Sequence, residues 1–454
     1  MTAPVRFVIL GGGPAGNTAA THAARLGAEV TLVERDIVGG AAHLWDCIPS
    51  KAMIATGGAM ALTRRSGGLG LADVDASFDL ESLGPRNAAI TERLSRSVST
   101  LLESQGVRML RGSGRLKGPH QVVVETDTDV IEIDADAVLL ATGSRPRVPP
   151  WAEVDGERIL TTRDAYPPPE IPEHLVVIGS GVTGVEFVHM FASFGSKVSL
   201  IVSRQQVLPD KDADVAAVLE ADFLARGVML LKGAKAEAID RGPDSVVVRC
   251  DDGRRVAASH ALLAIGFVPN SENLGLDAAG VESDRGFVPV NHHGQTNVAH
   301  IYAAGDLSGK LPLSSVASMQ GRKIAEHAMG LHTRAHRHLD YDKAASAIFT
   351  EPEIADVGLT ESEAFAAGRK IRATKVPFAA SARALIDGDA RGFVKIVSDP
   401  ATGVVLGGSI VGRNASELIS VLALAVTAGL RVTDIVESLL VHPSLAEALA
   451  DAAE

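Results

Sequence analysis

The chain has 454 residues and a formal net charge of −12 at pH 7. This length exceeds what one hydrophobic core supports and predicts about three domains. The acidic balance gives no electrostatic basis for binding nucleic acid, and only two cysteines exclude a disulfide scaffold and favour a reducing compartment. No apolar run approaches the roughly 18 residues of a membrane span. We therefore expect a cytoplasmic protein with no membrane span and no nucleic-acid partner.

The N-terminus carries a complete dinucleotide-binding pattern. The β-rich run 5–10 is followed by GGGPAG and a helical segment, and the next strand-like run ends at Glu34. This order is the fingerprint that holds a pyrophosphate at a helix N-terminus. Gly11 is expected to make the tight turn, Gly13 to admit the pyrophosphate and Gly16 to let helix and strand pack. Glu34 is expected to accept hydrogen bonds from a ribose.

The segment 39–51 reads GGAAHLWDCIPSK and contains Cys47. The carboxylate of Asp46 is predicted to oppose ionisation of this neighbouring thiol, because two negative charges disfavour each other. The second cysteine, Cys250, ends the strand-like run 245–250. We interpret Cys250 as a packing residue.

A second dinucleotide pattern begins at residue 175, with the apolar run LVVI followed by GSGVTG, a helical segment and the strand-like run 197–202. Two such units predict two bound dinucleotides, and a nicotinamide facing a flavin is the commonest pairing. The second unit ends in Ser203 and Arg204 where a site for NAD would place an acid. Because serine and arginine side chains can bind a 2′-phosphate, which an acid would repel, NADPH is favoured over NADH. The alternative is that Arg204 is a solvated loop residue and the site accepts either nucleotide.

Three further strand-like runs end in a manner that suits a dinucleotide site. The runs 137–144 and 261–266 end in turns of small residues, and the run 301–306 ends at Asp306. An acid at such a strand end is placed to hold a polyol. These runs therefore predict additional contacts to the bound nucleotides.

Histidines are concentrated in two polar segments. His332, His336 and His338 alternate with arginines that would repel a cation, and His292 and His293 have turn-like neighbours. We interpret both segments as solvated connectors, and no metal site is predicted.

Over essentially its whole length the chain resembles the class I pyridine nucleotide-disulfide oxidoreductases, which include lipoamide dehydrogenase and glutathione reductase. The resemblance is carried by both glycine turns, ATGS at 141–144, AGD at 304–306, FTEPEI at 349–354 and VHPSLAE at 441–447. It implies an α/β fold with two dinucleotide-binding (Rossmann-like) domains, a C-terminal α/β dimerisation domain and a homodimer. The expected boundaries are an FAD-binding domain over 1–149, an NAD(P)-binding domain over 150–269, completion of the FAD domain over 270–340 and a dimerisation domain over 341–454. In that last domain we expect a strand over 403–411 and an apolar interface helix over 415–430.

The resemblance also implies which residues bind each cofactor. FAD is expected at Gly11, Gly13, Pro14, Ala15, Gly16, Glu34, Arg35, Gly40, Ala41, Lys51, Gly114, Thr142, Gly143, Ser144, Asp306, Pro312, Leu313, Ser314 and Ser315. The nicotinamide nucleotide is expected at Gly179, Gly181, Val182, Thr183, Gly184, Glu186, Ser203, Arg204 and Gly266. Asp306 would bind the flavin ribitol. Lys51 would form a buried pair with Glu186 beside the reacting rings, where a cation stabilises negative charge; the alternative is that Glu186 only packs and pairs structurally.

Departures from the resemblance concern the loop around Cys47. The family's loop reads G-G-T-C-x-x-x-G-C-x-P-S-K, and its two cysteines form the redox-active disulfide. Here Ala42 replaces the first cysteine and Asp46 replaces the glycine, while Cys47 matches the position against the flavin. Phe267 also stands where the family usually has arginine. This variant loop resembles the NAD(P)H:quinone reductase branch of the family.

The resemblance implies that NADPH reduces FAD and that electrons then pass directly to a diffusible small-molecule acceptor such as a quinone. His442 and Glu447 match the family's histidine, which acts from the partner subunit, and the glutamate that orients it. His442 would supply a proton, while Cys47 would tune the flavin without reacting. Three alternatives stay open: a transhydrogenase between NADPH and NAD⁺, a single-thiol disulfide reductase that uses Cys47, and a flavin-binding sensor or interaction protein.

Overall fold

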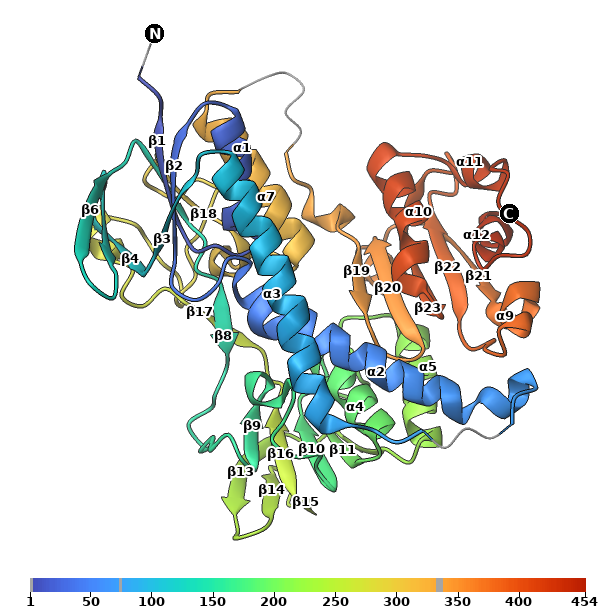
Figure 1. The fold of residues 1–454 in the computed structure, drawn as a ribbon. Helices are drawn as coiled ribbons and strands as arrows, with labels where there is room; N and C mark the ends of the chain where they lie inside the picture. The colour runs from blue at the N-terminus through green and yellow to red at the C-terminus, as the bar shows by residue number, and fades with distance from the viewer. Residues whose placement is uncertain (1–2, 73–75, 332–337) are drawn as a thin grey trace. The chain divides into compact units, whose positions relative to one another are not determined.

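The computed structural model describes residues 3–72, 76–331 and 338–454. Within them the chain forms two compact units, and Figure 1 shows their helices and strands. The first unit contains residues 1–50, 82–146 and 267–341, and the second contains residues 51–81, 147–266 and 342–454. Among the helices described, none combines the length and apolar character needed to cross a membrane.

The first unit is built on a parallel sheet with the strand order β18-β7-β1-β2-β3. Helices α1 and α7 pack against each other (Figure 1), so closely that a Cβ on Gly321 of α7 would lie 2.1 Å from the carbonyl oxygen of Ala15. The elements are β1 (Arg6–Leu10), α1 (Pro14–Arg25), β2 (Glu29–Glu34), β3 (Arg108–Arg111), β7 (Ala137–Leu140), β18 (Ile301–Ala303) and α7 (Ser314–Ala328). This close packing fixes α1 against the sheet and so fixes the first glycine turn.

Smaller elements complete the first unit. An antiparallel sheet contains β4 (Ser113–Gly118), β5 (Gln121–Glu125) and β6 (Val130–Asp134), and β8 (Ser144–Pro146) pairs with β17 (Phe267–Pro269). A short helix, α6 (Leu276–Ala279), follows. Two longer helices, α2 (Ile48–Arg64) and α3 (Leu80–Ser104), contribute residues to both units.

The second unit contains another parallel sheet, with the order β12-β11-β10-β16-β9. Its core strand β10 is almost wholly buried because the run LVVI is apolar on both faces, as a central parallel strand requires. The elements are β9 (Ile159–Thr161), β10 (His174–Ile178), α4 (Val182–Phe194), β11 (Lys197–Val202), α5 (Ala213–Ala225), β12 (Met229–Lys232) and β16 (His260–Leu263). An antiparallel sheet of β13 (Ala236–Arg241), β14 (Val246–Cys250) and β15 (Arg255–Ala258) is attached.

Cys250 is buried at 2% exposure, which confirms its predicted packing role.

The C-terminal part of the second unit is an antiparallel sheet with the order β19-β20-β23-β22-β21. Its strands are β19 (Ser346–Ile348), β20 (Glu353–Gly358), β21 (Arg372–Pro377), β22 (Phe393–Ser398) and β23 (Val405–Gly412). Its helices are α8 (Glu361–Ala366), α9 (Ala382–Ile386), α10 (Ala415–Ala428), α11 (Val432–Val436) and α12 (Glu447–Ala453). The apolar helix expected over 415–430 ends at Ala428, because Gly429 adopts the left-handed conformation that terminates a helix.

Buried ion pairs connect this C-terminal sheet to the preceding residues of the same unit. Lys395 on β22 is only 2% exposed, and its Nζ lies 2.7 Å from Asp212 Oδ2 and 2.8 Å from Asp214 Oδ1. Burial of the ammonium group lowers its pKa, but the bonds to these carboxylates outweigh that effect and leave the pKa of Lys395 raised. The lysine is therefore charged, and it neutralises the acids before and at the start of α5.

Candidate cofactor and redox site

The first glycine turn has the steric pattern of a dinucleotide cradle. Gly11 has a φ of +107°, and a Cβ there would lie 2.2 Å from the carbonyl oxygen of Ala141. A Cβ on Gly16 would lie 1.8 Å from the carbonyl oxygen of Gly11, whereas a Cβ on Gly13 would meet nothing within 4 Å. Packing therefore requires the first and third glycines, while the second leaves open space at the N-terminus of α1. That space fits a pyrophosphate.

The other acids and hydroxyls predicted to bind FAD gather at the same edge of the sheet. Glu34 is the last residue of β2, and its carboxylate accepts a 2.7 Å hydrogen bond from the Gly12 amide. The hydroxyl of Ser144, which follows β7, donates to Asp306 Oδ2 over 2.6 Å, and Asp306 follows β18. These groups stand beyond the carboxyl ends of adjacent parallel strands, where open α/β sheets bind ligands. The described residues therefore fit the flavin nucleotide.

The remaining predicted FAD residues of the first unit surround this edge. Gly40 approaches the glycine turn, where a Cβ would lie 2.8 Å from the Gly13 Cα, and Gly114 lies against the Leu10 side chain at the end of β1. Thr142 donates a 2.7 Å hydrogen bond to the Asn270 carbonyl. Arg35 is exposed and pairs with Asp36 over 3.2 Å, and its contact with FAD stays a prediction. Pro14 and Ala15 open α1, and Gly143 follows β7. Pro312 and Leu313 precede α7, and Ser314 and Ser315 are its first two residues.

The loop around Cys47 contains one turn of π-helix, Ala42–Asp46, which follows Ala41. The Cys47 amide donates to the Ala42 carbonyl over 3.2 Å, an i to i+5 bond. Cys47 Sγ lies 3.5 Å from the hydroxyl of Ser314, a residue predicted to line the flavin. The fold thus brings Cys47 beside a predicted flavin contact, while Ala42 supplies no second sulfur. Both cysteines of the chain are free.

His43 lies within the same π-helical turn. Its ring packs over Gly39, where a Cβ would lie 1.9 Å from Nδ1, and burial lowers the pKa of the imidazole. Within the described residues, Nδ1 has no hydrogen-bond partner. A half-buried imidazole with a lowered pKa therefore lies in the loop that carries Cys47.

An ion pair connects the predicted residues Lys51 and Glu186. Lys51 Nζ lies 2.8 Å from Glu186 Oε2, and the exposed fractions of the two side chains are 33% and 7%. The amide of Phe349 donates to the other Glu186 oxygen over 3.0 Å, and the Phe349 ring lies 5.0 Å from Lys51 Nζ. The pair was expected to be buried, and that expectation is correct only for Glu186. The Lys51 side chain is only partly covered within the described residues, whereas the Glu186 carboxylate is enclosed.

The second glycine turn repeats the steric pattern of the first. Gly179 has a φ of +111°, and a Cβ there would lie 2.2 Å from the Ala264 carbonyl oxygen. A Cβ on Gly184 would lie 1.9 Å from the Gly179 carbonyl oxygen, whereas one on Gly181 would meet nothing within 4 Å. Val182 and Thr183 begin α4 beside this open position, and Gly266 follows β16 with a φ of +92°. The described residues fit a second dinucleotide at the N-terminus of α4.

Ser203 and Arg204 follow β11 directly and are exposed. They occupy the strand end next to β10, where the acid of an NAD site would stand. The preference for NADPH over NADH stays a prediction.

His442 and Glu447 lie together near the C-terminus. His442 Nδ1 lies 2.7 Å from Glu447 Oε1, and the Ser444 amide donates to Glu447 Oε2 over 2.8 Å. The Ser444 amide and His442 hold the pKa of Glu447 below its usual range. The His442 side chain is 74% exposed and its Nδ1 is engaged by the carboxylate. The arrangement therefore orients an accessible imidazole whose Nε2 can exchange a proton.

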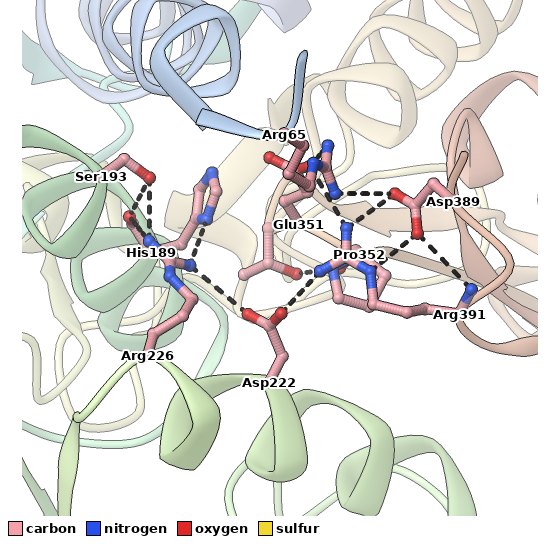
Figure 2. Close-up of polar contacts among 10 residues, drawn as sticks. Arg65, His189, Ser193, Asp222, Arg226, Glu351, Pro352, Asp389 and Arg391 are labelled. Carbon is pink, nitrogen blue, oxygen red and sulfur yellow. Dashed lines mark hydrogen bonds and ion pairs between the residues drawn. The ribbon is translucent and has the colours of Figure 1, made fainter. Parts of the chain in front are cut away.

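A polar network within the second unit anchors the helix that carries Glu186. One turn after Glu186, His189 Nδ1 accepts a 3.0 Å hydrogen bond from Arg226, which also donates to the hydroxyl of Ser193 (Figure 2). Arg226 pairs with Asp222 on α5 over 3.4 Å. These contacts hold α4 against α5, and sequence reasoning did not identify them because no local motif marks them.

The same network continues to the end of α2, the helix that carries Lys51. Arg391 lies 2.6 Å from both Asp222 and Asp389, and Arg65 pairs with Asp389 over 3.1 Å and with Glu351 (Figure 2). Burial raises the pKa of Asp389, but hydrogen bonds from Arg391 outweigh it and leave that pKa lowered. The helices bearing Lys51 and Glu186 are thus tied at a second point beyond their own ion pair.

The free energy of unfolding is expected to depend on pH in part because of His189. Burial and two arginines lower the pKa of His189 from 6.5 to about 3. Between these values the unfolded chain binds a proton that the folded chain does not, so stability falls as pH falls below 6.5, by up to about 1.4 kcal/mol per pH unit. His189→Asn, which keeps an acceptor near Nδ1, should show a shallower decline of the thermal midpoint between about pH 7 and about pH 5.5.

The control for this experiment is His120→Asn, because His120 is exposed. Burial also lowers the pKa of His43, His174 and His260, so the decline should become shallower without disappearing. An unchanged pH dependence in His189→Asn, measured at one protein concentration, would contradict the assignment.

Residues 5–321 match the family described as pyridine nucleotide-disulphide oxidoreductase, and residues 344–453 match its dimerisation domain. The chain is 42% identical over 461 residues to an NAD(P)H dehydrogenase (quinone) of Mycobacterium tuberculosis, covering 99% of this chain and 93% of that protein. It is 36% identical over 449 residues to a dihydrolipoyl dehydrogenase of Zymomonas mobilis, covering 98% and 96%. The crystal structure of LpdA from Mycobacterium tuberculosis superposes with a TM-score of 0.94 at 41% identity, covering 99% of each chain. These similarities confirm the predicted α/β fold.

Proposed function

Because the chain belongs to the pyridine nucleotide-disulphide oxidoreductases, flavoprotein enzymes that use FAD and NAD(P)H, we propose that it passes electrons from NADPH to a diffusible acceptor such as a quinone without using a redox-active disulfide. The dimerisation domain indicates a homodimer. The single observation that carries the proposal is Ala42 at the first cysteine position, in a loop that still places Cys47 beside Ser314. One sulfur cannot form the intramolecular disulfide that the family's loop otherwise contains.

When bound, FAD and NAD(P)H supply hydride transfer and storage of two electrons. The chain's own contribution begins with Lys51, whose ammonium is held by Glu186 and whose side chain is partly exposed. A fixed cation stabilises negative charge that develops next to it without reorganising at the moment of reaction. Glu186 is in turn fixed by the Phe349 amide, so the position of the charge is set by the fold.

Proton delivery to the acceptor is assigned to His442. Glu447 engages Nδ1 and leaves Nε2 to exchange a proton, which suits a quinone because it takes up two protons with two electrons. A positioned imidazole contributes roughly 10²–10⁴-fold to such a step. The exposed ring is consistent with action on an acceptor that arrives from solution.

Replacing Cys47 with Ser tests whether electrons leave through sulfur. Under the proposal, quinone reduction by NADPH stays within a factor of about two, because a group that makes no transition-state interaction changes neither kcat nor kcat/KM. Serine also keeps a hydrogen-bonding group near Ser314. The measurement is steady-state turnover under nitrogen with a set of quinones, small disulfides and NAD⁺ as acceptors, and with NADPH and NADH as donors.

Each alternative gives a different result in that assay. Collapse of turnover in Cys47→Ser would favour the single-thiol reductase, and fast reduction of NAD⁺ would favour the transhydrogenase. Slow turnover with every acceptor would favour the sensor. A wild-type preference for NADPH would support the assignment of Ser203 and Arg204 to a 2′-phosphate.

A further inference from the structure

A cluster of histidines lies in the first unit, apart from the residues assigned to FAD. His292, His293 and His338 each offer a ring nitrogen, and these nitrogens all lie within 4.8 Å of one another. The ring centroids of His292 and His293 are 4.0 Å apart, and those of His292 and His338 are 4.4 Å apart. The sequence pattern predicts only solvated connectors here, because the two segments are far apart in the chain. The fold brings them together.

The turn that carries two of these histidines is held in a defined shape. Asn291 Oδ1 accepts hydrogen bonds from the amides of His293 (2.8 Å) and Gln295 (3.1 Å). Gly294 completes the turn with a φ of +77° and presses on α7, where a Cβ would lie 2.6 Å from the Ile324 side chain. The backbone beneath the first two imidazoles is therefore fixed before any ligand arrives, which lowers the entropic cost of binding.

A fourth histidine supports the cluster from α7. The His327 ring stacks on His293 with centroids 4.4 Å apart. His327 Nδ1 also shares a 2.9 Å hydrogen bond with the hydroxyl of the buried Tyr302. This partner orients the His327 ring, and the stacked ring restricts the rotation of His293. The middle imidazole of the cluster is therefore supported by a second layer of contacts.

We propose that His292, His293 and His338 form a binding site for a borderline divalent transition metal ion such as Zn²⁺. Imidazole nitrogen suits Zn²⁺, Ni²⁺ and Cu²⁺, whereas Mg²⁺ and Ca²⁺ prefer oxygen ligands. Zinc–nitrogen bonds of about 2.0–2.1 Å place neighbouring ligand atoms about 3.3 Å apart, so the side chains need to contract modestly around the ion. Three protein ligands leave a coordination position for water or an external ligand.

The surroundings of the site are compatible with a cation. Two of the three ligands are exposed and one is half-buried, so an ion can enter from solvent. Arg334 and Arg337, which weighed against a metal in the sequence, lie outside the described residues together with His332 and His336. The proposal rests on the described imidazoles alone.

Calorimetric titration of the tag-free, FAD-loaded protein with Zn²⁺ tests the site. The expected result is one Zn²⁺ per chain, at least tenfold weaker binding in His293→Gln, and no comparable binding of Mg²⁺. His300→Gln is the matched control, because His300 stacks on His120 and already bonds the Pro119 carbonyl.

Further variants separate this site from others. If His293→Gln loses flavin or thermal stability, His292→Gln, an exposed position, takes its place. Loss of Zn²⁺ binding in Cys47→Ala together with retention in both histidine variants would overturn the proposal, because the ion would then be bound at the thiol. Equal binding in wild type and both histidine variants, or no saturable binding at all, would overturn it too.

Discussion

Replacing Lys51 with Met is expected to slow NADPH-driven turnover by about 10²–10³-fold, the loss typical of removing one preorganised group that stabilises developing charge. The reason is the fixed position of the ammonium, 2.8 Å from the Glu186 carboxylate and 5.0 Å from the centre of the Phe349 ring. Stopped-flow measurement of flavin absorbance under nitrogen should show that the first reductive step becomes slow. Lys117→Met is the matched control, since Lys117 forms an exposed pair with Glu132.

The Lys51→Met variant also leaves the buried carboxylate of Glu186 without its cation. Such an uncompensated charge costs about 3–5 kcal/mol of stability, which could by itself reduce activity. The double variant with Glu186→Gln removes both charges and should regain thermal stability. If Lys51 stabilises charge on the bound cofactor, turnover stays low in the double variant. Recovery of turnover together with stability would show instead that the pair is only structural.

Two alanine substitutions in the first glycine turn are expected to have different effects: Gly16→Ala should lower stability, whereas Gly13→Ala should lower flavin affinity. Gly16→Ala places a methyl group 1.8 Å from a carbonyl oxygen and should cost about 1–3 kcal/mol or more, because rigid backbone must move. Gly13→Ala meets no protein atom within 4 Å, and its backbone φ of −69° is one that alanine adopts readily. Its methyl group enters only the space proposed for the pyrophosphate. We expect flavin affinity to fall at least about tenfold, or about 1.4 kcal/mol.

Two measurements are needed for each glycine variant: the thermal midpoint of the flavin-free protein and the flavin retained after gel filtration. Gly118→Ala is the control, because a Cβ there also meets nothing within 4 Å and Gly118 belongs to no proposed site. The proposal is contradicted if Gly13→Ala retains flavin like the wild type. It is equally contradicted if Gly13→Ala destabilises the flavin-free protein as strongly as Gly16→Ala.

Local patterns made much of this molecule predictable. Each glycine turn is flanked, within about 20 residues, by the strand-like and helical segments that identify it. The order of strand, turn and helix can therefore be predicted from the local sequence. The pairs Lys51–Glu186 and His442–Glu447 were predicted from the resemblance, and the structure brings both together. The pairing of Arg35 with Asp36 was not predicted, because no motif encodes it, and the contact of Arg35 with FAD stays a prediction.

Most of the features that sequence reasoning missed join segments that are distant in the chain. The Phe349 amide that fixes Glu186 comes from 163 residues away, and Arg391 meets Asp222 across 169 residues. The histidine cluster likewise needs the turn after Asn291 to meet the residues following α7. Backbone amides and scattered charges carry no periodic signal, so only the folded chain reveals that they are partners.

The buried ion pairs of Lys395 and the half-buried pairs of Arg391 have a consequence for how such chains can be recombined. The acids Asp212, Asp214 and Asp222 belong to residues 147–266, and their cations belong to residues 342–454. A chimera that takes its last hundred or so residues from a relative keeps these acids but does not necessarily bring the matching bases. Leaving a buried acid such as Asp212 without its cation costs about 3–5 kcal/mol. Although the family profile separates these segments, their exchange between relatives is expected to succeed only where acids and bases are transplanted as sets.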